Sequence, residues 1–223
     1  MQEIIDFLRL LSANNNREWF NANKDMYRRV NAQYQEFAAA LLDGIASFDD
    51  TVRALTVADC TYRIYRDTRF SPDKTPYKTH MGVYIVQRGK CSGYAGYYLH
   101  IDPGAGHFLY AGLHMPEPPV LRSVREEIVD NGDALMEAVA AAKGFHLLRE
   151  RELKRNPKDF PAGHKYDDLL RLKDFGIERP LSEKELLAPD MLKRAVACLR
   201  TTKPMVDILN RAVQYAYDEM ADR

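Results

Sequence analysis

The fold of this protein is decided by residues 94–114, which read YAGYYLHIDPGAGHFLYAGLH. Aromatic and aliphatic side chains alternate over Tyr94–Asp102 and again over His107–His114, a pattern that predicts two β-strands. The connection Pro103-Gly104-Ala105-Gly106 favours turns and is too short for a crossover helix. These residues therefore predict an antiparallel hairpin.

The same pattern extends the sheet toward the N-terminus. Tyr62–Phe70 and His80–Gln87 are rich in aromatic and β-branched residues, and we predict a strand for each of them. One side of a strand must face a core, and we expect Tyr97, Leu99 and Ile101 to pack against a long N-terminal helix.

Helical spacing dominates before the sheet. Apolar residues recur at this spacing over residues 4–11, and Asn14-Asn15-Asn16 interrupts the pattern. Asn15, with Glu18 three residues later, matches a capping box and predicts the start of a second helix. An apolar stripe from Trp19 to Ile45 predicts that this helix is long, continuous and amphipathic.

Helical spacing returns after the sheet. Pro118-Pro119 predicts the start of a helix that Asn131-Gly132 ends, and a further helix follows from Leu135. Ser182 matches a second capping box, and Pro204 is expected to divide or kink the last helices.

The pattern as a whole predicts an α+β protein, with a central antiparallel sheet flanked by N-terminal and C-terminal helices. No linker-like composition marks a boundary, so residues 1–223 are predicted to form a single domain.

Composition places the chain among ordinary globular proteins, with 46% hydrophobic and 29% charged residues. The 32 Lys+Arg and 32 Asp+Glu residues give no net charge, which argues against nucleic-acid binding, because that needs a basic surface. The three cysteines lie far apart and predict neither a disulfide framework nor a zinc knuckle. The N-terminus carries acids, and no apolar run reaches about 18 residues, so we expect a cytoplasmic protein with no membrane association.

The segment of residues 62–80 is the first candidate functional site. It carries five cations and two acids, and therefore has a local charge of +3 within a neutral chain. In a regular strand, Arg66 would lie among apolar neighbours and would need a carboxylate or an anionic ligand, because a guanidinium does not lose its proton.

Our hypothesis from this pattern is a cleft that binds a small phosphorylated or carboxylate ligand, with catalysis as an open extension. Asp67 would orient the cations, and His100 is the best available general acid or base. The residues expected to bind the ligand are the cations of the segment, Arg63, Arg66, Arg69, Lys74 and Lys78. Clustered cations do not distinguish binding from turnover, so the sequence assigns no enzymatic activity and no cofactor.

The alternative is a structural or protein-interaction module without enzymatic activity. In that case Arg66 pairs with a core acid such as Glu18 or Asp102, and Asp67 forms a solvated ion-pair ladder with the arginines beside it. Nothing in the sequence indicates which protein would be the partner.

Histidine offers a weaker pattern. His100 and Asp102 share a strand face and would suit a divalent metal together with a third ligand from a neighbouring strand. Two residues at this spacing are also typical of hydrogen-bonded structural histidines, and the chain contains no H-E-x-x-H motif. The sequence therefore predicts no metal site.

The stretch RIYRDTRFSPDKTPYKTH, residues 63–80, resembles a motif of one uncharacterised family, the domain of unknown function 2461. The resemblance extends to the residues around Trp19, Leu99, His114 and Leu172, and so covers nearly the whole chain. It implies one full-length domain of a mostly bacterial type. It implies no catalytic residue, because no activity of the family is known.

Overall fold

The computed structural model describes residues 1–222 and confirms an α+β fold. Its sheet is antiparallel throughout, with the strand order β1-β2-β3-β5-β4. The strands are β1 (Met81–Val86), β2 (Gly96–Ile101), β3 (His107–Leu113), β4 (His146–Leu147) and β5 (Phe175–Leu181). The first three lie where the alternating pattern predicts them.

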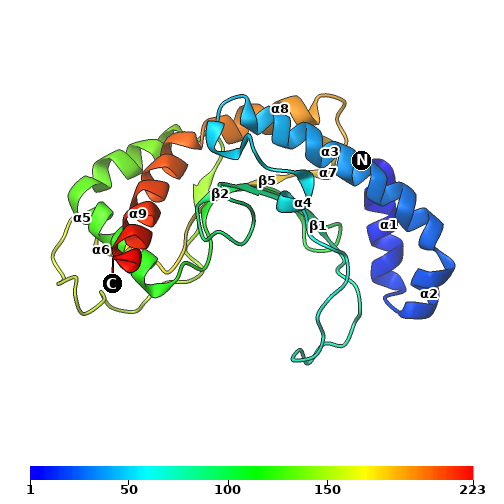
Figure 1. Ribbon diagram of the computed structural model, residues 1–223, viewed down its shortest axis with the longest axis horizontal. Coiled ribbons are helices and arrows are strands. Elements are labelled where there is room, and N and C mark those ends of the chain that lie inside the picture. The colour runs from blue at the N-terminus through cyan, green and yellow to red at the C-terminus, as the bar shows by residue number, and fades with distance from the viewer. Residues whose placement is uncertain (223) are drawn as a thin grey trace.

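Helices cover one face of this sheet (Figure 1). The helices are α1 (Gln2–Ala13), α2 (Arg17–Ala22), α3 (Lys24–Ala46), the 3-10 helix η1 (Asp50–Val52), α4 (Val57–Cys60), α5 (Pro118–Ala141), α6 (Asp167–Leu170), α7 (Glu183–Leu186), α8 (Met191–Arg200) and α9 (Lys203–Ala221). Helices α3 and α8 pack together over the sheet, α5 and α9 pack at one end, and α1 and α2 lie at the other. Within residues 1–222, no helix is long and apolar enough to cross a membrane.

The covered face of the sheet carries the core. Tyr97, Leu99 and Ile101 of β2 are at most 1% exposed and belong to one apolar cluster with residues of α3, as the alternation of β2 predicts. Polar atoms in this core are paired. The Tyr34 hydroxyl of α3 donates to the backbone oxygen of Gly82 in β1 at 2.7 Å, and the Tyr97 hydroxyl donates to Asp49 at 2.8 Å.

The opposite face of the sheet carries large aromatic side chains, and glycines make room for two of them. A Cβ atom at Gly82 would lie 2.1 Å from the Tyr98 hydroxyl, and one at Gly176 would lie 2.2 Å from the Tyr110 ring. Real Cβ contacts are not that short. Glycine at these two positions therefore lets both rings lie flat over the neighbouring strand.

Residues 62–70 do not form the predicted strand. They turn back at their tip, and Tyr65 pairs with Tyr77 in a single bridge. Backbone hydrogen bonds from Arg66 to Pro76 (2.9 Å) and from Lys78 to Ile64 (2.8 Å) hold the two arms together. Aspartates and prolines explain the difference, because Asp67 and Asp73 accept hydrogen bonds from the backbone two residues later and favour turns over sheet pairing.

The predicted long helix is interrupted at Asn23, which has φ −108° and ψ 21° and separates α2 from α3. The cap of α2 also differs from the prediction. Asn16 accepts the hydrogen bond of the Trp19 backbone N–H, while the Asn15 side chain bonds to both backbone groups of Tyr77. The expected capping residue, Asn15, therefore bonds to a residue distant in sequence and does not cap its own helix.

In the C-terminal half, α5 continues through Asn131-Gly132 with a kink at Asn131, where we predicted its end. The Tyr166 ring occupies the space that a side chain at position 132 would fill, so Gly132 lets this ring pack against the kinked part of α5. The capping box of α7 at Ser182 and the division of α8 from α9 just before Pro204 are confirmed.

Strands β4 and β5 were not predicted. The sequence of β5, FGIERPL, contains a proline and two charges that obscure the alternation. The strand forms because it pairs with β3 over seven residues.

We expect Tyr97→Phe to lower the free energy of unfolding by about 1.5 to 3 kcal/mol, because it removes a buried hydrogen bond to the carboxylate of Asp49. Chemical denaturation measures the change. Tyr215→Phe is the matched control, because Tyr215 is 56% exposed and its hydroxyl donates a hydrogen bond to Glu219. This substitution should change the free energy of unfolding by less than about 0.5 kcal/mol. Equal effects of the two variants would contradict the assigned role of Tyr97.

Candidate functional site

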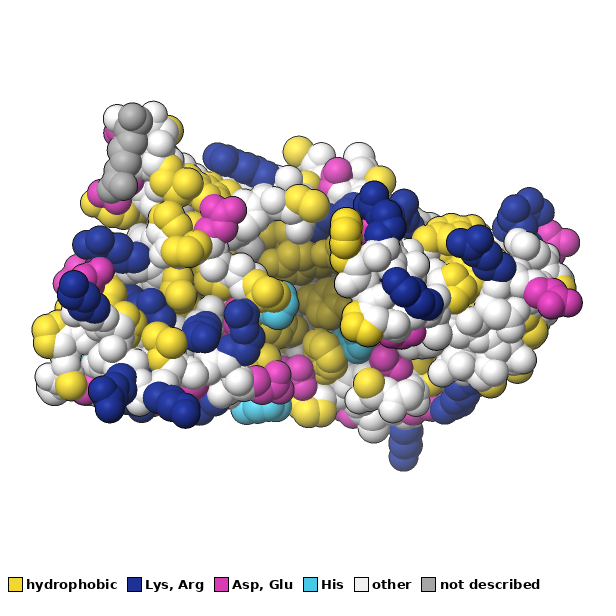
Figure 2. Space-filling view, turned by 90° about the horizontal axis from the view of Figure 1, so that it is seen from below, with side chains coloured by type: hydrophobic (Ala, Val, Ile, Leu, Met, Phe, Trp, Pro, Cys, Tyr) yellow, Lys and Arg dark blue, Asp and Glu magenta, His cyan; other side chains and the backbone are white. Residues whose placement is uncertain are grey.

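A cleft of about 500 Å³ lies against the face of the sheet that the helices leave uncovered. Figure 2 shows this face as a hollow with hydrophobic and histidine side chains at its base. The base is formed by alternate residues of the strands, Tyr84, Tyr98, His100, Phe108 and Tyr110, which we call the cleft floor. One wall comes from residues 62–80 and the other from residues 148–174.

The cleft floor is a continuous aromatic surface. Ring centroids of Tyr98 and Phe108 are 5.9 Å apart, and the His100 ring stacks on Phe108 at 4.6 Å with an angle of 18°. Burial raises the pKa values of Tyr84 and Tyr98, so both hydroxyls stay neutral. The floor therefore offers apolar ring faces and neutral hydroxyl groups.

Tyr110 is the unusual member of the floor. Within residues 1–222, its hydroxyl is the one buried side-chain polar atom that has no hydrogen-bond partner. The residue is 8% exposed and lines the cleft. Buried hydroxyl groups are normally paired, so this unpaired hydroxyl is an exception, although its oxygen is itself buried.

His100 lies at one edge of the floor among polar neighbours. The Tyr98 hydroxyl is 2.8 Å from Nδ1 of His100, and Oδ2 of Asp102 is 3.8 Å from its Nε2. His80 is the last residue of the adjoining wall, and its ring centroid is 4.9 Å from that of His100. Burial and the neighbouring His80 lower the pKa of His100 to about 4, so its imidazole is neutral at pH 7.

These three residues could hold a metal ion. Each of His80, His100 and Asp102 offers one ligand atom within 4.8 Å of the other two, and the part of the chain that the structure describes contains no second group of this kind. Without a metal, His100 is a neutral hydrogen-bonding group and a weak base.

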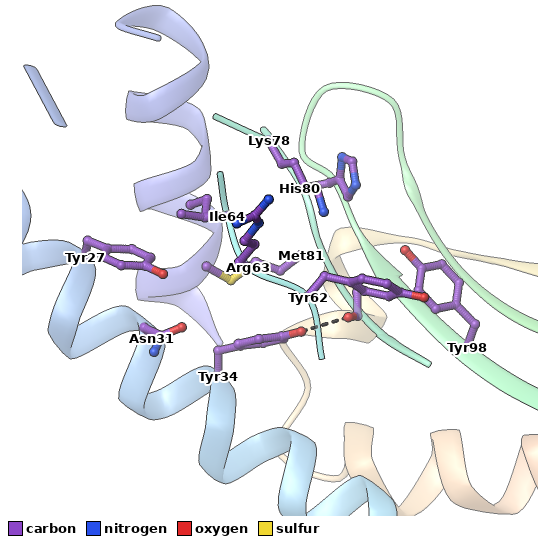
Figure 3. A pocket seen from close by; sticks show the side chains of 11 residues that line it. Tyr27, Asn31, Tyr34, Tyr62, Arg63, Ile64, Lys78, His80, Met81 and Tyr98 are labelled. Carbon is purple, nitrogen blue, oxygen red and sulfur yellow. Dashed lines mark hydrogen bonds between the residues drawn. The ribbon is translucent and has the colours of Figure 1, made fainter. Parts of the chain in front are cut away.

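The structure separates the five predicted ligand-binding cations into two groups. Lys78 lines the cleft, and both it and Arg63 line a smaller adjoining pocket beside His80 (Figure 3). The other three lie in the turned-back part of the segment, where each is engaged locally. Arg66 pairs with Asp73 and hydrogen-bonds to Thr75, Arg69 pairs with Asp67, and Lys74 donates to the backbone of Thr68.

Among residues 1–222, no hydrogen bond or ion pair joins Asp67 to His100. Its carboxylate is 47% exposed and accepts hydrogen bonds from the Arg69 side chain, which lower its pKa. His100 is in the cleft, so the two residues predicted for catalysis occupy different parts of the structure.

The base of the segment is anchored to the N-terminal helices. The Asn15 amide donates to the backbone oxygen of Tyr77 at 2.9 Å, and its oxygen accepts from the Tyr77 N–H at 3.1 Å. The Phe20 ring stacks on Tyr77 at 4.0 Å. The tip is free by comparison, with Phe70 93% exposed. The anchored part is the part that carries Lys78 and His80.

The sequence did not indicate the residues that line the opposite wall. Arg151 pairs with Asp174 at 3.0 Å, and burial together with Glu150 raises the pKa of Glu178. These residues lie in loops and in the unpredicted strand β5, where no local pattern marks them. Tyr110, by contrast, follows from alternation along β3 once the covered face is known.

The fold and cleft define a class, an α+β protein with helices on one face of an antiparallel sheet and an aromatic cleft on the other. The family model described as "Conserved hypothetical protein (DUF2461)" matches residues 3–208. The chain therefore belongs to this family, as the motif at residues 63–80 indicates. A search of curated proteins and a search of solved structures found no match.

We expect Asn15→Ala to destabilise the protein by about 1 to 3 kcal/mol, because both backbone groups of Tyr77 lose a part-buried partner. The anchored segment should also be cleaved faster by trypsin, which mass spectrometry locates. Asn14→Ala is the control, since its amide makes one exposed bond to Leu10, and it should leave cleavage within residues 62–80 unchanged. Faster cleavage in the control alone would refute the anchoring role.

Proposed function

We propose that the cleft binds a small organic anion that combines a phosphate or carboxylate group with a planar apolar body. One observation carries this proposal: Lys78 lies beside the aromatic floor of the cleft, and among residues 1–222 no carboxylate lies within 4.0 Å of its amino group.

Electrostatics favour an anion at this wall. Lys78 is half-buried, and burial followed by the charge of Arg63 lowers its pKa. A second cation nearby and no acid within ion-pairing distance leave a positive field. The Tyr62 ring, 5.1 Å from Lys78 Nζ, compensates this charge only in part. An oxyanion in the cleft would neutralise Lys78 and accept a hydrogen bond from it.

The cleft floor indicates the chemistry of the uncharged part of the ligand. Rings of Tyr98 and Phe108 suit stacking with a planar group. A cleft with apolar surfaces and few convergent polar groups is typical of small-molecule sites.

Catalysis is a weaker extension of this proposal. His100 remains the candidate acid or base, but a pKa of about 4 makes it a poor proton acceptor near neutral pH. Binding requires no such step, and we therefore propose a binding site first. The cytoplasmic location and bacterial origin stay predictions from the sequence.

The proposal gives Arg66, Arg69 and Lys74 a structural role. Their local partners hold the turned-back shape of the segment. The alternative of internal ion pairs expects the pair of Arg69 with Asp67, whereas Arg66 pairs with the exposed Asp73 of its own segment and not with the core acid that the alternative names, Glu18 or Asp102. Phe70, exposed at the tip with the Arg69 guanidinium 5.8 Å from its ring, also fits that alternative, because an exposed aromatic residue can contact a protein partner.

Phenyl phosphate is a suitable probe of the cleft, since it joins an oxyanion to one aromatic ring. We expect it to bind the wild-type protein, and we expect Lys78→Gln to weaken binding about tenfold, the equivalent of one lost charge-assisted hydrogen bond of about 1.4 kcal/mol. Isothermal titration calorimetry measures both affinities.

Lys74→Gln is the matched control, because it removes the same charge from the same segment outside the cleft, and its affinity should equal that of the wild type. Equal losses in the two lysine variants, or no binding of phenyl phosphate by the wild type, would overturn the proposal.

A further inference from the structure

The pairing of β1 with β2 brings two distant histidines and an aspartate together. The last ladder pair is Met81 with Ile101, so the next position outward places His80 opposite Asp102. His100 lies two residues before Asp102, and alternation puts both on the same face of the strand. The three ligand atoms consequently converge within 4.8 Å of one another.

Two of these side chains are held in a defined orientation. Oδ1 of Asp102 accepts hydrogen bonds from the backbone N–H groups of Gly104 (2.8 Å) and Ala105 (3.1 Å), and Oδ2 faces His100. When Nδ1 of His100 donates to the Tyr98 hydroxyl, Nε2 presents its lone pair toward Asp102. A hydrogen bond at the second ring nitrogen is how metal-binding histidines are usually oriented.

The charge at this place is also uncompensated. The Asp102 side chain is 12% exposed, and among residues 1–222 no Lys or Arg nitrogen lies within 4.0 Å of it. Its neighbours are the imidazole rings of His80 and His100 and the backbone N–H groups of Gly104 and Ala105. A buried carboxylate without a cation is unfavourable, and a bound cation would remove that penalty.

We propose that His80, His100 and Asp102 form a binding site for a divalent transition metal ion of the zinc type. Two imidazole nitrogens and one carboxylate oxygen suit Zn²⁺, Co²⁺ or Fe²⁺, whereas Mg²⁺ and Ca²⁺ require oxygen ligands. Ligand atoms around a tetrahedral zinc ion lie about 3.4 Å apart. Side-chain rotations that move the ligand atoms by about 1 Å would therefore complete this geometry.

The remaining coordination positions face the cleft, because His80 and His100 both line it. Three protein ligands with an open position are the arrangement of catalytic rather than structural zinc sites. This site goes beyond the proposed anion binding and does not depend on it, since the metal ligands are distinct from Lys78 and Arg63.

The test is a calorimetric titration of the full chain with ZnCl₂ alone, without any organic anion. We expect one Zn²⁺ ion per chain with a micromolar or lower Kd, and no heat from MgCl₂. Asp102→Asn retains the oxygen that accepts the Gly104 and Ala105 hydrogen bonds but loses the charge, and it should weaken zinc binding at least tenfold. His80→Ala should do the same.

Two controls address other zinc-binding groups. His114→Ala removes a cleft histidine outside the cluster, and Cys91→Ser removes an exposed thiol, and both should bind zinc as the wild type does. Co²⁺ supplies an independent signature, because intense visible absorption bands report four or five ligands. Zinc affinity that falls in the controls but not in Asp102→Asn and His80→Ala would refute the site, as would absence of zinc binding by the folded wild type.

Discussion

The register of β2 between β1 and β3 is the constraint on which the rest of the structure depends. Tyr97 and Leu99 face the helices in this register, and Tyr98 and His100 face the cleft. A slip of one residue would place the aromatic floor in the core and the aliphatic residues in solvent. The core on one side and the cleft on the other are thus two consequences of one pairing.

Local ion pairs hold the turned-back shape of the segment of residues 62–80. Arg66 and Arg69 satisfy the acids of the segment itself, which leaves the cations at its anchored base without such partners. Among residues 1–222, Lys78 therefore lines the cleft without a carboxylate partner, next to a floor of aromatic rings. The proposed anion site and the proposed metal site share that cleft but use different residues, so a ligand could contact both.

Much of the fold was predictable because its signals are local. Alternation located β1, β2 and β3, and the capping box at Ser182 located α7. The failures occur where distant contacts outweigh local preference. Asn15 bonds to Tyr77 across the structure and not to its own helix, and β5 forms against β3 despite a weak strand pattern. For the candidate site, His100 and Lys78 were predicted as site residues, and the alternation of β3 indicates Tyr110 once the covered face is known. No local pattern marks Arg151 in the opposite wall.

The sequence by itself determined the α+β class, the three consecutive strands with their alternating faces, and the family, because period, turn residues and motif are properties of short stretches. Only the tertiary structure decided which face stays uncovered, which cations are neutralised, and that His80 meets Asp102. Those outcomes depend on the packing of helices and on strand register between segments far apart in the chain. No run of neighbouring residues encodes such contacts, since each forms only when the whole sheet is assembled.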